Sequence, residues 1–428
     1  MPRRILPVSS GKGGVGKTTF AVNFALHLSR HKPTILVDLD TGTSSVRNCL
    51  PVDPKKDLYH VKKRGARLEE CITRLPERMD PHGRHRNFGV IASPRNFIEE
   101  IANPSPAFRR QLADEINRLP AEFVVLDLRA GLDHTVLDFL PYSNSGILVF
   151  TPQHPAATMA ASDIVKAILF RSLRIVFGKG STFYSLRGME RYYEFINDLL
   201  DRVEDVYDTA IPNLDAFLRE LREALGDHPI LHAIADTLES FRVYYVLNMF
   251  NGVEESYEHA VVPFVDNLTQ NVSSRLHLTQ LGWIVEDQRL HDANCSGYPI
   301  SLDRRHAETS EREKRSTSAS DDAIAAELAA LESSVLGLRR RRSDHRPRPK
   351  DVIAQAPEET HDLLDGQLQT LKAMYSDRKK DTVRENFSYI TYRALNLMSP
   401  GYGANELGTT QLAAPERLLE WYMSRQMV

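Results

Sequence analysis

The segment Gly11–Thr18, GKGGVGKT, constrains the fold more than any other part of the chain. It directly follows a short apolar run, Ile5–Val8, and opens a helical pattern over about Thr18–Ser29. Glycines let backbone N–H groups approach a phosphate closely, and the first turn of a helix adds partial positive charge. The Lys17 ammonium can reach β- and γ-phosphate oxygens, and the Thr18 hydroxyl can bind Mg²⁺. The predicted phosphate-binding residues are Gly11, Lys12, Gly13, Gly14, Val15, Gly16, Lys17, Thr18 and Thr19.

Strand and helix patterns alternate over the first 300 residues, which is typical of βαβ units and a parallel sheet. The apolar runs are nearly continuous, as in strands that helices cover on both faces. The expected strands are Ile5–Val8, Thr34–Val37, Gly89–Ala92, Phe123–Leu126, Gly146–Phe150, Val243–Leu247 and Leu281–Val285. The predicted fold class is therefore α/β, with a doubly wound, mostly parallel sheet.

Composition divides the chain into three parts. Residues 1–302 carry the strand pattern, interrupted by a helical insertion at about 171–242. Residues 303–357 are predicted to form a charged linker, in which the spacing of apolar residues over Ile324–Leu338 indicates a short docking helix. Residues 358–428 are expected to form a helical C-terminal extension.

Charge and cysteine usage exclude several function classes. The 54 Lys and Arg against 57 Asp and Glu give a net charge of −3, which provides no overall attraction to nucleic acid. The three cysteines stand singly, so neither a disulfide framework nor a paired-cysteine zinc site is expected. No apolar run approaches the roughly 18 residues of a spanning helix, and no signal peptide precedes the first strand. We therefore expect a cytoplasmic protein.

Lys12, ahead of Lys17 in the same loop, makes the segment resemble the deviant Walker A sequence KGGVGKT of the MinD/ParA class of P-loop ATPases. Two neighbouring cations repel each other unless phosphate offsets both charges. The resemblance implies that ATP and Mg²⁺ bind here and that two protomers close face to face. It also implies that Lys12 crosses to the partner's phosphates, so that Lys12 and Lys17 both serve catalysis.

Three aspartates follow two of the expected strands, in segments that resemble the two switches of this class. Strand alternation places Asp38 and Asp40 on one side of the segment VDLD, facing the loop. The resemblance implies that Asp38, Asp127 and Thr18 hold Mg²⁺ and that Asp40 orients the attacking water. The alternative for Asp38 and Asp40 is to cap the loop that follows. The class usually carries Pro where this chain has Arg129, which either contacts phosphate or a partner or lies on the solvated surface.

Asn248 ends a later strand, at the place where members of the class set an Asn against the adenine edge. No guanine-reading TKxD or NKxD motif occurs there, which favours ATP over GTP. A turn-forming role is the alternative for Asn248. Residues 281–300 resemble the closing strand and adenine-side loop of the class, and Phe150–His154 is most similar to its FlhG/FleN–MinD branch.

The resemblance implies an ATP-dependent dimerising switch that slowly hydrolyses ATP to ADP and phosphate. Such a switch positions or regulates a cellular assembly and acts with a protein activator or cargo, here unknown. One alternative is a ParA-like, DNA-associated partitioning ATPase, although DNA is the less favoured partner because only Arg339–Arg348 offers a basic stretch. Another is a non-hydrolysing nucleotide-binding scaffold. The segment Pro415–Val428 either contacts the inner face of the membrane or docks on protein, since it has no basic polar face.

Overall fold

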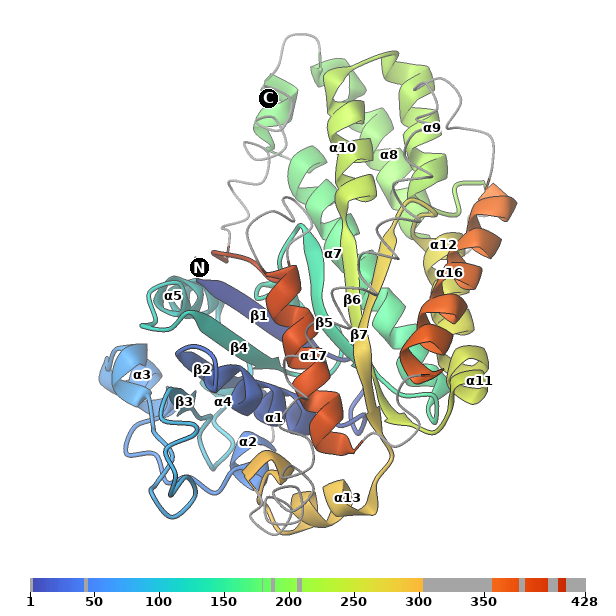
Figure 1. Ribbon diagram of the computed structural model, residues 1–428. Coiled ribbons are helices and arrows are strands. Elements are labelled where there is room, and N and C mark those ends of the chain that lie inside the picture. Colours follow the sequence, from blue (N-terminus) through green and yellow to red (C-terminus); the bar gives the residue numbers. More distant parts are fainter. Residues whose placement is uncertain are drawn as a thin grey trace. The chain divides into compact units, whose positions relative to one another are not determined.

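The computed structural model describes residues 3–41, 45–178, 180–185, 189–205, 210–302, 356–376, 382–398 and 407–412. Seven strands form one sheet in the order β3-β2-β4-β1-β5-β6-β7 (Figure 1). The strands are β1 Arg4–Ser9, β2 Thr34–Leu39, β3 Phe88–Ile91, β4 Phe123–Leu128, β5 Asn144–Phe150, β6 Arg242–Phe250 and β7 His277–Val285. Neighbouring strands all pair in parallel. The chain runs from β1 to β2 and β3, returns to place β4 between β2 and β1, and then continues on the other side of β1 through β5, β6 and β7. The predicted α/β class and all seven predicted strands are confirmed.

Helices flank this sheet, and two of them adjoin the loop after β1. They are α1 Lys17–Ser29, which follows the loop, and α7 Pro155–Phe177, which follows β5. The other helices of the N-terminal 302 residues are α2 Ser45–Cys49, α3 Leu58–Arg64, α4 Glu99–Ala102, α5 Pro106–Ile116, α6 His134–Leu137, α8 Tyr193–Glu204, α9 Leu214–Leu225, α10 Pro229–Ser240, α11 Val253–Ser256, α12 Val262–Asn271 and α13 Gln288–Cys295. Shorter turns are the 3-10 helices Leu68–Cys71, Thr182–Ser185, Glu190–Tyr192 and Ile300–Leu302 and the π-helix Tyr257–Val261.

Helices α8, α9 and α10 occupy the region predicted as a helical insertion at 171–242. They pack on one another beside α7 (Figure 1), which itself begins well before that region. Each buries one apolar face: α8 buries Leu199 and Leu200, and α9 buries Phe217 and Leu221. An Asn213 cap, whose side chain accepts a hydrogen bond from the Ala216 N–H, begins α9.

The C-terminal helices α16 Ala356–Ser376 and α17 Val383–Leu397 pack directly on the sheet (Figure 1). Gln367 of α16 accepts a hydrogen bond from the Tyr245 hydroxyl at 2.7 Å and donates one to the Leu278 carbonyl at 3.3 Å. Phe387 of α17 is fully buried and stacks on Phe20 of α1, with ring centroids 6.1 Å apart. The described part of 359–428 thus belongs to the same compact unit as the sheet.

A short C-terminal segment also joins the sheet at β1. The Ile5 N–H donates to the Thr409 carbonyl at 2.8 Å, and the Thr409 N–H donates to the Ile5 carbonyl at 3.0 Å. Gly408 has a φ of 75°, and a Cβ at this position would lie 2.5 Å from the Ile5 carbonyl oxygen. A glycine is therefore needed where this segment crosses β1.

Several predicted features lie outside the described residues. These are residues 303–355 of the predicted linker at 303–357, the helix at Ile324–Leu338, the basic stretch Arg339–Arg348 and the segment Pro415–Val428. Among the helices that the structure describes, none is both long and apolar enough to cross a lipid bilayer.

Candidate nucleotide-binding site

The loop between β1 and α1 requires glycine at three positions. Gly14 and Gly16 have φ values of 85° and 82°, in the left-handed region that side chains disfavour. A Cβ on Gly16 would also lie 2.2 Å from the Asn248 side-chain nitrogen. A Cβ on Gly11 would overlap the backbone of Ala160 on α7, 2.2 Å from its carbonyl carbon. The sequence therefore produces a tight turn that exposes backbone N–H groups at the start of α1.

Lys17 and Thr18 begin α1, and both contact Asp127 at the end of β4. The Lys17 ammonium lies 2.6 Å from one carboxylate oxygen of Asp127, and the Thr18 hydroxyl donates to the other at 2.8 Å. Asp40 lies slightly farther away, with a carboxylate oxygen 3.7 Å from the Lys17 ammonium. The structure thus brings together four predicted site residues that come from three separate segments of the sequence.

Asp38 lies beside this group because β2 and β4 are neighbours in the sheet. Its Cα is paired in register with that of Asp127, and both side chains are fully buried. One Asp38 oxygen accepts the Asp40 N–H at 3.1 Å, and the other accepts the Ser93 N–H at 3.4 Å. Burial raises the pKa of Asp38 well above its usual value, and the charges of Asp127 and Asp40 raise it further.

The same burial raises the pKa of Asp127, although the nearby Lys17 ammonium opposes that shift. Three carboxylates therefore share one buried lysine, an arrangement that additional positive charge would stabilise. Carboxylates and a hydroxyl are hard oxygen ligands of the kind that Mg²⁺ prefers. Asp38, Asp127 and Thr18 thus fit the ion.

Over the described ranges, no group of three or more His, Cys, Asp or Glu side chains is arranged to hold a metal by itself. Mg²⁺ at nucleotide sites is usually bound by one or two carboxylates together with substrate phosphates and waters. The residues of this site therefore fit a Mg²⁺ ion that binds together with a nucleotide.

Lys12 lies on the exposed side of the loop, and its ammonium makes no hydrogen bond or ion pair with the described residues. Two exposed apolar side chains lie near the base of the loop: Leu132 is 44% exposed and Met159 is 42% exposed. Leu132 follows Gly131, whose N–H donates to the Ser10 carbonyl at 3.0 Å. Met159 precedes the α7 residue that contacts Gly11. The loop thus carries an exposed cation, and each of the two exposed apolar side chains comes directly beside a residue that contacts the segment Ser10–Gly11.

Asn248 faces the loop from β6. Its side-chain nitrogen donates to the Val15 carbonyl at 2.8 Å, and the residue is only 5% exposed. The β6–β7 pairing shifts register between Leu247 and Phe250, and Met249 has a φ of 54° in the left-handed region. Such irregularities re-aim side chains and are frequent at functional sites. Here the irregularity follows directly on the asparagine that holds the loop.

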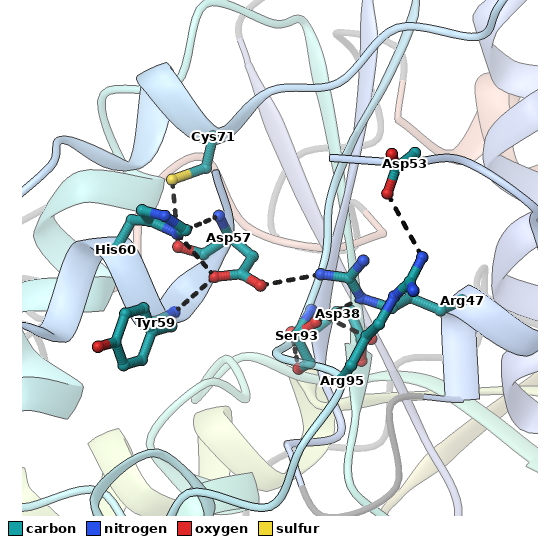
Figure 2. A network of polar contacts seen from close by, with 9 residues as sticks. All are labelled: Asp38, Arg47, Asp53, Asp57, Tyr59, His60, Cys71, Ser93 and Arg95. Carbon is teal, nitrogen blue, oxygen red and sulfur yellow. Dashed lines mark hydrogen bonds and ion pairs between the residues drawn. The ribbon is translucent and has the colours of Figure 1, made fainter. Parts of the chain in front are cut away.

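Two polar residues of the site were not among the predicted ones. Asn294 of α13 accepts a hydrogen bond from the Thr19 hydroxyl at 3.2 Å, which joins the segment 281–300 to α1. Ser93 contacts Asp38 through its N–H and donates its hydroxyl to the Asp38 carbonyl at 3.1 Å (Figure 2). Ser93 could have been predicted from the sequence, because it directly follows the expected strand Gly89–Ala92 at the same edge of the sheet as the three aspartates.

Arg129, which stands where the class usually carries Pro, directly follows β4 and is half-buried.

Comparison with known proteins identifies the family. The family described as "CobQ/CobB/MinD/ParA nucleotide binding domain" matches residues 6–300. The flagellum site-determining protein YlxH of Helicobacter pylori is 29% identical over 165 residues, which cover 38% of this chain and 52% of that protein. The septum site-determining protein MinD of Escherichia coli is 26% identical over 170 residues, 39% of this chain and 58% of that protein. The chain thus spans about half the length of these curated relatives.

Two solved structures align with this chain over about 70% of its length. The septum site-determining protein MinD of Pyrococcus horikoshii, complexed with Mg-ADP, aligns with a TM-score of 0.40 and 16% identity, over 69% of this chain and 87% of that one. A ParA family ATPase of Chlorobium tepidum aligns with a TM-score of 0.39 and 15% identity, over 70% and 90%. Because the family match extends over residues 6–300 and includes the phosphate loop and the three aspartates, the chain belongs to the CobQ/CobB/MinD/ParA nucleotide-binding domain family.

Proposed function

We propose that this protein is an ATP-dependent dimerising switch that hydrolyses ATP to ADP and phosphate and thereby positions or regulates a cellular assembly. The observation that carries the proposal is the contact between the phosphate loop and two aspartates at neighbouring strand ends. Asp127 contacts Lys17 and Thr18 of the loop, and Asp40 lies beside Lys17. Membership of a nucleotide-binding family supports the choice of ligand. The names of the relatives, site-determining proteins of the flagellum and the septum, support the positioning role.

The loop would bind the triphosphate through its backbone N–H groups, and Lys17 would turn from Asp127 and Asp40 to the β- and γ-phosphates. Thr18, Asp38 and Asp127 would hold Mg²⁺, which supplies positive charge to the phosphate oxygens. The side-chain oxygen of Asn248 is the group that could accept the adenine amino group, because the side-chain nitrogen already donates to Val15.

Hydrolysis in this class of site depends on positioning and on neutralising the charge of the transferred phosphoryl group. Asp40 is suited to orient the attacking water because its carboxylate is 14% exposed and lies 3.7 Å from the Lys17 ammonium. It is thus accessible to water and close to the place where the γ-phosphate would lie. Asp38 fixes the Asp40 backbone through the 3.1 Å hydrogen bond.

Dimerisation would bring the phosphate loops of two protomers face to face. Lys12 supports this part of the proposal, because it is exposed on the loop and unbonded within the described part of the chain. The exposed Leu132 and Met159 beside the loop would be covered in such a dimer. Each Lys12 would then neutralise phosphate bound by the partner, and loss of the γ-phosphate would reopen the dimer.

Two further parts of the proposal concern partners and location. A protein activator or cargo would bind the ATP-bound state. The protein would act in the cytoplasm. Contact with the inner face of the membrane would involve Pro415–Val428, which lies outside the described residues.

Phosphate release from ATP in the presence of Mg²⁺ tests the enzymatic core of the proposal. Wild-type protein should hydrolyse ATP slowly, and Lys17→Ala should release no phosphate above background. Lys55→Ala is the matched control, because it removes an exposed lysine that lies outside the loop. Equal rates for wild type and Lys17→Ala would contradict the proposal.

A further inference from the structure

The connection between β2 and β3 is basic in a chain that is slightly acidic overall. Residues 47–86 contain eleven Lys or Arg and six Asp or Glu, a net charge of +5, whereas the whole chain carries −3. A concentration of one sign of charge attracts ligands of the opposite sign to that face. This part of the surface therefore favours anions.

A hollow of about 550 Å³ opens in this basic region. Three arginines from three separate segments line it: Arg47 on α2, Arg78 before β3 and Arg95 after β3. Asp53 is the one acidic residue in its lining, so the charged groups at the hollow sum to +2. Pockets of roughly 300–1,000 Å³ with a few convergent polar groups are typical of small-ligand sites.

Arg47 is fixed at the wall of the hollow. Its side chain is only 10% exposed, and it donates to the Ser93 carbonyl at 2.7 Å and to the Asp57 carboxylate at 2.9 Å (Figure 2). Asp57 in turn accepts the Tyr59 N–H at 3.0 Å and begins helix α3. The guanidinium group is thus held in place before any ligand arrives, which reduces the entropy lost on binding.

Arg78 and Arg95 are in contrast available to a ligand. Arg95 is 71% exposed and lies 3.4 Å from Asp53, which is itself 91% exposed. Such an exposed pair contributes little stability, so an incoming anion can displace Asp53 from Arg95. Arg78 is exposed and makes no hydrogen bond or ion pair within the described ranges.

We propose that the hollow lined by Arg47, Arg78 and Arg95 binds a small polyanion that carries two or more phosphate or carboxylate groups. Guanidinium groups bind both kinds of oxyanion in a bidentate manner, and three of them around one hollow suit a ligand with several negative charges. The site rests on its own residues and does not require that the phosphate loop binds ATP.

The hollow is connected to the nucleotide site by a short chain of hydrogen bonds. Arg47 binds the Ser93 carbonyl, and Ser93 contacts Asp38 through both its N–H and its hydroxyl (Figure 2). Only Ser93 therefore stands between the wall of the hollow and the carboxylate assigned to Mg²⁺.

Calorimetric titration with inorganic tripolyphosphate tests the site, with citrate as a second probe that separates phosphate from carboxylate chemistry. The titrations use the full-length Lys17→Ala variant, so that the phosphate loop does not contribute an anion site of its own. We expect at least one of the two probes to bind. Adding Arg78→Ala and Arg95→Ala should weaken this binding about tenfold or more, because two charge-assisted contacts are lost. Asp53→Asn should instead strengthen it, because it removes the competing carboxylate.

The matched control adds Arg64→Ala and Arg86→Ala to the same background. Both residues are exposed, both lie in the basic connection, and neither lines the hollow. This control loses the same charge but keeps every arginine that lines the hollow. It should therefore retain the affinity of the Lys17→Ala protein within about twofold, because salt screens the attraction of more distant charges. Equal weakening in the two sets would show general attraction to a basic surface and would overturn the proposal. Failure of both probes to bind the Lys17→Ala protein would overturn it as well.

Discussion

The Lys17 ammonium lies 2.6 Å from the Asp127 carboxylate, so the strand end beside the loop neutralises the buried cation of the phosphate loop. A nucleotide that binds as proposed would therefore take Lys17 away from Asp127. Asp127 would then lose its main cationic partner while it remains fully buried. Mg²⁺ arriving with the phosphates would replace that positive charge, so nucleotide and metal are expected to bind together.

Lys17→Ala should weaken nucleotide binding strongly. Hydrogen bonds to charged groups contribute roughly 1.5–3 kcal/mol, so the dissociation constant should rise by at least about tenfold. Titration with a fluorescent ATP analogue measures the change, and Lys55→Ala should bind like wild type. An unchanged affinity in Lys17→Ala would place the nucleotide elsewhere.

Asp40→Ala should separate binding from hydrolysis. The carboxylate is proposed to orient water and not to hold the phosphates, so ATP affinity should change only slightly. The turnover number should fall about 100-fold, a typical effect of losing a group that positions or activates the nucleophile. Asp114→Ala, an exposed carboxylate on α5, is the control. A normal steady-state rate in Asp40→Ala would refute the role.

His85 should make the protein sensitive to mild acid. It is 3% exposed, with its Nδ1 2.9 Å from the Leu26 carbonyl of α1, and burial lowers its pKa to about 4. The unfolded chain takes up the proton near pH 6.5, whereas the folded protein resists protonation until about pH 4. The free energy of unfolding should therefore fall as the pH decreases through this window, by roughly 2–3 kcal/mol from this residue.

Urea unfolding at pH 7 and at pH 5 measures this effect in wild type and in His85→Asn. The variant should lose less stability between the two pH values, because its side chain does not titrate. Some acid sensitivity should remain, since burial also lowers the pKa of His27 on α1. Identical losses in the two proteins would show that His85 does not titrate as proposed.

The α17 helix should be part of the cooperative fold. Phe387 is fully buried against Phe20 and His27 of α1, the helix that begins at Lys17. Phe387→Ala should lower the free energy of unfolding by about 3–5 kcal/mol, as is usual for a buried phenylalanine. Phe195→Ala, at a side chain that is 38% exposed, should have a much smaller effect. Similar unfolding curves for both variants would mean that α17 unfolds independently of the sheet.

The elements of the fold could be predicted because their signals are local. Apolar runs marked all seven strands, and the glycines of Gly11–Thr18 marked the turn that follows the first. Asp38 and Asp127 were grouped through the resemblance of their segments to the two switches of the MinD/ParA class. Their closeness in the structure has a simple cause, because carboxyl ends of parallel strands meet at one edge of a sheet.

Contacts between distant segments could not be predicted in this way. The hydrogen bond from Thr19 to Asn294, the pairing of Ile5 with Thr409 and the stacking of Phe20 on Phe387 join residues far apart in the chain. Neither propensity nor periodicity contains information about such partners. The side-chain direction of Asn248 also depends on an irregular pairing that has no signature in a single sequence.

The mass of the protein in solution with a non-hydrolysable ATP analogue and Mg²⁺ tests the central claim most directly. Wild type should be a dimer with the analogue and a monomer with ADP. Lys12→Ala should bind the analogue but stay largely monomeric, because each protomer then lacks the cation that its partner needs. Wild-type protein that is saturated with the analogue and still has the mass of one chain would contradict the account.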